Sequence, residues 1–237
     1  MNTTTSQPAA TRRRLFAFLA ASVVPVLARP AAARTAQAQE ANAPFPDRPV
    51  RMIIPVAPGG SLDILGRLFA RQLTPVLGQP VVAENHPGAG SNLAFELVAR
   101  ARPDGHTLLV GSDPLTINPS LYRRAGFDPV RDFAPVAELV RAPQVLVVHP
   151  SHPANDLAAF LRLARAAEGR MAMASQGNGS IGHLTGAVLA RRAEVGFTHV
   201  PYRGGGPAVV DVVAGHVESP VVTLPAALEH IRGGRLK

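Results

Sequence analysis

The chain contains no cysteine and no tryptophan among its 237 residues, and charged residues are scarce. The lack of cysteine excludes disulfides, thiolate metal sites and thiol catalysis. The nine Phe and two Tyr residues are dispersed, so they do not form the basic and aromatic stripes that bind nucleic acids. Hydrophobic residues make up 46% of the chain and charged residues 17%, which is the composition of a folded protein rather than a disordered one.

The formal net charge of +8 comes largely from the N-terminal end of the chain. Residues 1–38 contain five arginines and no acidic residue, which leaves 19 basic residues against 16 acidic ones in the rest. Those 19 are scattered, with only Arg123-Arg124 and Arg191-Arg192 adjacent. We therefore expect solvated surface charge and no nucleic-acid partner.

The eight histidines do not show the spacing of a metal site. The chain contains neither H-x-x-x-H nor H-E-x-x-H, the arrangements that place two imidazoles on one helix face. This spacing gives a metal site no support, and we expect no cofactor.

Residues 1–38 have the three parts of an export signal. A basic start at Thr11–Arg14 precedes an apolar run of 14 residues, Leu15–Ala28, which is shorter than the ~20 residues of a membrane-spanning helix. Ala36-Gln37-Ala38 is a small-x-small cleavage site, and Ala31–Ala33 is a rival one. We expect export to the periplasm, and the adjacent arginines resemble a twin-arginine signal.

From residue 49 onward, one unit recurs: a short apolar strand, a glycine-rich turn and an amphipathic helix. Strands are predicted at 50–56, 81–84, 107–112, 136–140, 145–148, 171–175, 197–202 and 220–224, and helices at 62–77, 92–101, 156–168, 181–192 and 207–214. This alternation predicts mostly parallel sheets, with ligands bound beyond the carboxyl ends of the strands. The pattern restarts near residue 150, which predicts two similar α/β lobes.

Three of the predicted loops end in the same dipeptide: Gly60-Ser61, Gly90-Ser91 and Gly179-Ser180. Glycine lets a ligand approach the backbone, and the free N–H groups of a helix start favour an anion. Three such ends around one cleft would bind carboxylates without Lys or Arg. The alternative is that each serine only caps its helix. Asp63, in the first turn of its helix, either interacts with the helix dipole or faces the cleft.

The stretch Gly177–Gly182 also matches the G-x-G-x-x-G pattern of dinucleotide sites. The next strand lacks the acidic residue that would bind the ribose, although Arg203 could suit a 2′-phosphate. An NAD(P)-dependent oxidoreductase is therefore an alternative function. Ser180 does not fit a hydrolase nucleophile, because Asn178 stands where G-x-S-x-G requires glycine. His183, in the first turn after Ser180, could be a cap, a core residue or a ligand contact.

Many short blocks, in order, give the chain a specific resemblance from about Phe45 to Lys237. They are Phe45–Arg51, Pro58–Ser61 with Asp63 and Arg67, Leu77–Val82, Glu84-Asn85, Pro87–Gly90, Pro103–Gly105 with Thr107–Leu109, Asn118–Tyr122, Ala174–Ser180, His183-Leu184 and His199–Gly204. The chain resembles the substrate-binding proteins of tripartite tricarboxylate transporters, also called Bug receptors.

The resemblance implies a type II periplasmic-binding fold, in which each lobe is a mostly parallel sheet flanked by helices and the ligand lies in the interlobe cleft. It places the first lobe at 46–145, the second at 146–230, and the start of a strand returning to the first lobe at 231–237. The implied function is that of a monomeric, non-enzymatic receptor. Its partners would be a small organic carboxylate and the membrane permease subunits of the transporter.

The resemblance also implies ligand-binding residues in both lobes. They are Gly59, Gly60, Ser61, Asp63, Gly90 and Ser112 in the first lobe, and Ser175, Gly177, Asn178, Gly179, Ser180, His183 and Tyr202 in the second. Ser91 and His106 depart from the family pattern, which usually has glycine and tyrosine there. Roughly the last quarter of that pattern, which completes the first lobe, is missing, so an inactive truncated receptor is a further alternative.

Overall fold

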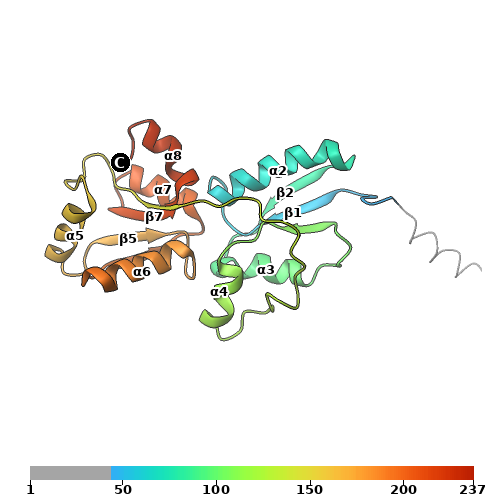
Figure 1. Ribbon diagram of the computed structural model, residues 1–237, viewed down its shortest axis with the longest axis horizontal. Coiled ribbons are helices and arrows are strands. Elements are labelled where there is room, and N and C mark those ends of the chain that lie inside the picture. The colour runs from blue at the N-terminus through green and yellow to red at the C-terminus, as the bar shows by residue number, and fades with distance from the viewer. Residues whose placement is uncertain (1–43) are drawn as a thin grey trace, which may run out of the picture. The chain divides into compact units, whose positions relative to one another are not determined.

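Two β-sheets organise residues 44–237, the part of the chain that the computed structural model describes (Figure 1). The first contains β1 (Val50–Ile54), β2 (Val81–Asn85) and β3 (Thr107–Leu109), in the order β2-β1-β3. The second contains β4 (Gln144–Leu146), β5 (Ala172–Ser175), β6 (Thr198–Pro201) and β7 (Ser219–Thr223), in the order β4-β7-β5-β6. We call the parts built around these sheets the first and the second lobe. The export signal predicted at 1–38 lies outside the described residues.

The first sheet is entirely parallel, because each of its strands is followed by a helix that returns the chain to the same edge. The helical segments of this lobe are α2 (Ser61–Leu77), η1 (Ala89–Ser91), α3 (Asn92–Ala99) and α4 (Pro114–Leu121). α2 contacts β1 and β2 and covers the core formed by Val50, Met52 and Ile54, while α3 packs against β1 and β3. Gly78 ends α2 in the left-handed conformation, with φ of 68°, as its position after the last apolar residue predicts.

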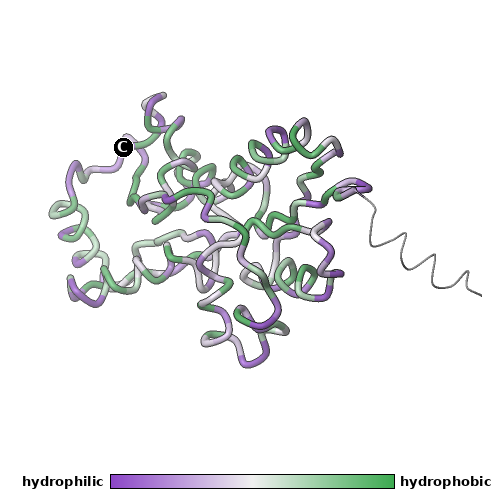
Figure 2. The backbone as a smooth tube through the Cα atoms, turned by 45° about the vertical axis from the view of Figure 1, so that its right-hand side comes forward, coloured by the Kyte–Doolittle hydropathy of each residue, from purple (hydrophilic) through white to green (hydrophobic). Residues whose placement is uncertain are grey.

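The second sheet is covered on both faces and has one antiparallel pair, β4 with β7. Its helices are α5 (Leu157–Ala166), α6 (Ile181–Ala193), α7 (Gly205–Val213) and α8 (Leu224–Arg232). One core cluster contains residues of α7 and α8, and another contains Phe160 of α5 and Met173 of β5. In Figure 2, hydrophobic and hydrophilic residues alternate along the helices, as amphipathic helices require. The predicted α/β class, with mostly parallel sheets flanked by helices, is confirmed.

The strand predicted at 136–140 is wrong. These residues form no regular structure, and Val136 is 86% exposed. A β-branched run becomes a strand only where a neighbouring strand accepts its hydrogen bonds, and β3 pairs with β1 alone. The sequence patterns also missed α4 and α8, both of which have proline in the first turn.

The chain ends beside the second sheet. The Lys237 N–H donates to the Val148 carbonyl at 3.0 Å, and the Val148 N–H donates to the Lys237 carbonyl at 2.8 Å. The predicted lobe boundary at residue 146 lies within β4, and the first residues of the segment 231–237 form the last turn of α8. Within residues 44–237, no helix combines the length and the apolar character that a membrane crossing needs.

Candidate functional site

The loop between β1 and α2 is held by a buried carboxylate. Gly59 adopts a φ of 86°, which favours glycine, and its N–H donates to Asp63 Oδ2 at 3.0 Å. Asp63 Oδ1 also accepts from Arg67 Nε and Asn85 Nδ2, each at 2.9 Å. Asp63 is only 5% exposed. These three hydrogen bonds all lie within the first lobe, where they connect the loop to α2 and to the end of β2.

The second loop of the first lobe, around Gly90, is anchored by α4. Asn118 is fully buried, and its Nδ2 donates to the Gly90 carbonyl at 2.8 Å and to Asn92 Oδ1 at 2.7 Å. Ser91 is also buried and donates its hydroxyl to the Pro55 carbonyl at 3.0 Å. The Tyr122 hydroxyl lies directly over the Gly90 Cα, leaving no space for a Cβ. Asn118 and Tyr122 were not in the predicted site, although the block Asn118–Tyr122 marked their segment.

In the second lobe, two serines shape the loop between β5 and α6. Ser180 Oγ accepts from the His183 N–H at 3.2 Å and donates to the Gly177 carbonyl at 2.7 Å, so it caps α6. Ser175 is 1% exposed, and its hydroxyl hydrogen-bonds to His199 Nε2 at 2.7 Å and to the Gly177 N–H at 3.2 Å. Both hydroxyls are thus engaged within the lobe.

Two imidazoles stack behind this loop. The rings of His183 and His199 are 4.1 Å apart and nearly parallel, at 9°. The Gly179 N–H donates to His183 Nδ1 at 3.3 Å, which requires that this nitrogen is unprotonated. Burial, together with the neighbouring His183, lowers the pKa of His199. The stacked pair therefore packs behind the loop and supports it.

The hydroxyl of Tyr202 is directed at α7. It donates to Asp211 Oδ2 at 2.6 Å, and burial followed by this carboxylate raises the pKa of Tyr202 to about 12. Tyr202 also lines the cavity between the lobes. Its hydroxyl is thus occupied by Asp211.

The two lobes meet through backbone and small side chains. The Ala57 N–H donates to the Arg203 carbonyl at 2.8 Å, and the Ser61 and Thr223 hydroxyls form a hydrogen bond. A Cβ on Gly206, at the start of α7, would lie 2.8 Å from the Gly59 carbonyl carbon. Only glycines allow the first turns of α2 and α7 to approach this closely.

A cavity of about 270 Å³ lies between these loops. At ~30 Å³ per water molecule, this is room for about nine waters, which suits a small ligand. The cavity is lined by Pro55, Val56, Gly88, Ala89, Gly90, Ser91, Pro114, Tyr122, Gln176, Gly177, Asn178, Ser180, Pro201, Tyr202 and Arg203. Arg203 is the only charged residue among them.

The predicted ligand-binding residues are divided between this cavity and a neighbouring one. Five of them line the small cavity: Gly90, Gly177, Asn178, Ser180 and Tyr202. Gly60, Ser61 and Ser112 line a larger cavity of about 1110 Å³ with Ser180, beside β3 and the segment 129–142. Gly59, Asp63, Ser175, Gly179 and His183 line neither and position the loops instead.

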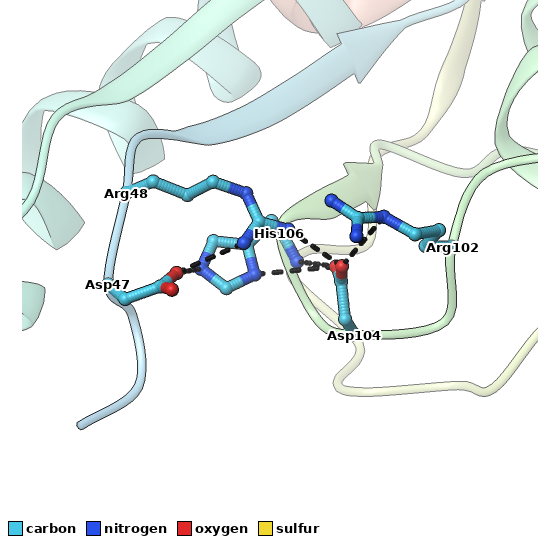
Figure 3. Close-up of polar contacts among 5 residues, drawn as sticks. All are labelled: Asp47, Arg48, Arg102, Asp104 and His106. Carbon is cyan, nitrogen blue, oxygen red and sulfur yellow. Dashed lines mark hydrogen bonds and ion pairs between the residues drawn. The ribbon is translucent and has the colours of Figure 1, made fainter. Parts of the chain in front are cut away.

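His106 lines neither cavity and lies in a charged cluster (Figure 3). Its ring is in contact with two carboxylates: Nε2 lies 3.0 Å from Asp47 Oδ1, and Nδ1 lies 3.3 Å from Asp104 Oδ1. Arg48 donates to Asp104 Oδ2 at 2.7 Å. The His106 N–H, followed by Arg48, lowers the pKa of Asp104. This cluster attaches the segment before β1 to the loop before β3.

Among residues 44–237, no group of three His, Cys, Asp or Glu side chains is arranged to hold a metal ion. The G-x-G-x-x-G segment lies at the start of α6, where the Asp113 carboxylate accepts from the Ile181 N–H at 2.5 Å. A carboxylate at that position would repel the pyrophosphate of a dinucleotide. Two α/β lobes that meet at a small cavity of glycine-rich loops are characteristic of a solute-binding protein.

Comparison with known proteins identifies the family. Residues 65–237 match the model of the tripartite tricarboxylate transporter family receptors, and the chain belongs to this family. The resemblance seen in the sequence is thereby confirmed. Family and fold are those of solute-binding receptors, whose members include periplasmic binding proteins.

Individual relatives agree with this assignment. BugT of Bordetella pertussis is 38% identical over 195 residues, which cover 81% of this chain and 60% of BugT. The structure of Rpa4515 from R. palustris with adipate has a TM-score of 0.79 at 32% sequence identity, and the match covers 65% of the Rpa4515 chain. The structure of MatC from Rhodopseudomonas palustris with bound malate has a TM-score of 0.74 at 33% sequence identity, and the match covers 66% of the MatC chain. The chain spans less than two thirds of the lengths of these three proteins.

Proposed function

We propose that this protein is an exported, extracytoplasmic receptor that captures a small organic carboxylate for a tripartite tricarboxylate-type transporter. The observation that carries the proposal is the cavity of about 270 Å³ between glycine-rich loops of the two lobes. Solved structures with the same fold contain adipate and malate. The export signal at 1–38 and delivery to membrane permease subunits are part of this proposal, and no catalytic step is needed.

Recognition would depend on the backbone and on polar side chains that line the cavity. The hydroxyls of Ser91, Ser175, Ser180 and Tyr202 are all hydrogen-bonded within their own lobes. The remaining candidate partners for a carboxylate are loop N–H groups and the side chains of four residues that line the cavity: Tyr122, Gln176, Asn178 and Arg203. Ligand binding would hold the lobes together, and the permease would recognise the closed form.

The test is a thermal-shift panel of organic acids, amino acids and NAD(P), followed by titration calorimetry of each hit. A ligand at 100 times its Kd should stabilise the fold by about 2.7 kcal/mol. Asn178→Phe should fill the cavity and weaken acid binding by about tenfold or more. Ala187→Phe, at an exposed position of α6 outside the cavity lining, is the matched control. A shift with NAD(P) alone, or no cooperative melt, would disprove the receptor function.

A further inference from the structure

A carboxylate of the first lobe occupies the start of a helix in the second lobe. Asp113 directly precedes α4, and its Oδ2 accepts from the N–H of Ile181, the first residue of α6, at 2.5 Å. The N–H of His183, two residues further along that turn, donates to Ser180 Oγ. The favourable anion position at the start of α6 is therefore filled by the chain itself.

The charge of Asp113 has no cationic partner in the described part of the chain. Asp113 is half-buried, and none of the ion pairs among residues 44–237 includes it. Burial raises the pKa of this carboxyl, while its bond with Ile181 acts in the opposite direction. The carboxylate therefore lies at the lobe interface with the start of α6 as its polar partner.

This carboxylate lies at the border of the small cavity. The chain neighbours of the contact, Pro114 beside Asp113 and Ser180 beside Ile181, both line that cavity. Asp113 and Ile181 themselves line the adjacent larger cavity. The small cavity thus has one cation in its lining, Arg203, and one anion at its border, Asp113.

We propose that Asp113 restricts the ligand to a small acid with a single carboxylate. One carboxylate can pair with Arg203, and a second one would have to approach Asp113 at the start of α6. This inference rests on the proposed function and names the ligand class of the same cavity. Two like charges held close together in a partly buried site repel enough to change affinity by about tenfold or more.

The test is titration calorimetry with pairs of acids that differ only in a terminal methyl or carboxylate group: butyrate and succinate, valerate and glutarate, hexanoate and adipate. We expect the unmodified protein to bind the monocarboxylate of each pair about tenfold more tightly. Asp113→Asn keeps an acceptor for the Ile181 N–H and removes the charge. It should raise dicarboxylate affinity about tenfold and change monocarboxylate affinity by less than about threefold.

Asp156→Asn is the matched control, because Asp156 Oδ1 accepts from the Ala159 N–H at 2.6 Å at the start of α5 within the second lobe. Asp156→Asn should leave the preference for monocarboxylates over dicarboxylates unchanged. If the unmodified protein binds the dicarboxylates as tightly, or if Asp113→Asn changes both acids equally, the restriction is wrong while the receptor function stands. If no acid binds the unmodified protein, the receptor function itself fails. Should Asp113→Asn not fold, Asp113→Ser provides the same comparison.

Discussion

At the scale of single residues, the polar side chains of the candidate site mostly bind the protein's own loops. Asp63 accepts from three donors on the β1–α2 loop, α2 and β2. Ser175 and Ser180 hold the loop that begins at Gln176. A buried polar group must be hydrogen-bonded, and the nearest partners are usually backbone groups of the same loop. These side chains therefore determine where the loop N–H groups point.

Replacing Asp63 with Asn should destabilise the first lobe. An amide offers one acceptor oxygen to the three donors that face the carboxylate, so buried donors lose their partners. We expect a loss of about 2 kcal/mol, or roughly 4–8 °C in melting temperature. Arg67→Met removes only the partly exposed partner and should cost less than about 1 kcal/mol. Equal losses in the two variants would contradict a structural role of the carboxylate.

At the scale of elements, an ion pair connects two parallel strands of the first sheet. Arg51 of β1 binds Glu84 of β2 through Nε at 2.8 Å and Nη2 at 2.7 Å. The hydrogen bonds from Arg51, assisted by His86, lower the pKa of Glu84 to about 2. The side chain of Glu84 is 29% exposed and that of Arg51 is 44% exposed. The pair thus stabilises the register of β1 and β2 at the edge of the lobe.

The contribution of Glu84 should depend on pH in a defined direction. Because its pKa in the folded state is lowered from 4.5 to about 2, the stabilisation is complete above pH 4.5 and is lost as the pH falls toward 2. The full shift corresponds to about 3 kcal/mol, and solvent screening of this partly exposed pair reduces the expected share to about 1 kcal/mol.

Melting curves of the unmodified protein and of Glu84→Gln between pH 7 and pH 2.5 measure this contribution. The difference between the two melting temperatures should be about 2–4 °C at pH 7 and should become smaller below pH 4.5. Glu229→Gln, at the exposed pair with Arg232 on α8, should stay within about 1 °C of the unmodified protein. If the difference in melting temperature between the unmodified protein and Glu84→Gln does not change with pH, the pair of Arg51 and Glu84 has no electrostatic role.

At the scale of the whole molecule, glycines decide how closely the lobes can meet. Gly206 of α7 faces the backbone of Pro58, Gly59 and Gly60, and an added Cβ would lie 2.8–3.0 Å from three of their atoms. Backbone atoms cannot move aside as a flexible side chain can. One methyl group at this position therefore has to separate the lobes.

Gly206→Ala should weaken acid binding by about tenfold or more without unfolding either lobe, because alanine suits the first turn of α7. Calorimetry gives the affinity, and small-angle scattering with saturating acid gives the radius of gyration, which should be larger than that of the unmodified protein. Gly111→Ala is the control, since its Cβ would meet only Leu115 Cδ2, at 3.8 Å. Unchanged affinity and radius would mean that lobe contact at Gly206 is not needed for binding.

The sequence by itself determined the α/β class, most strands and helices, and the family. Apolar periodicity predicted α2 and α6, Gly78 and Ser180 marked their ends, and ordered short blocks marked the receptor family. These signals are local, because a residue's place in a helix, strand or turn depends on neighbours a few positions away.

Only the tertiary structure decided which partners the site residues have. The bond from Asp113 to Ile181 and the approach of Gly206 to Gly59 join residues far apart in the chain. The predicted strand at 136–140 failed for the same reason, since a strand exists only where another strand lies beside it. Which hydroxyls cap a loop and which groups reach the cavity follows from distances across the fold, and sequence spacing does not contain those distances.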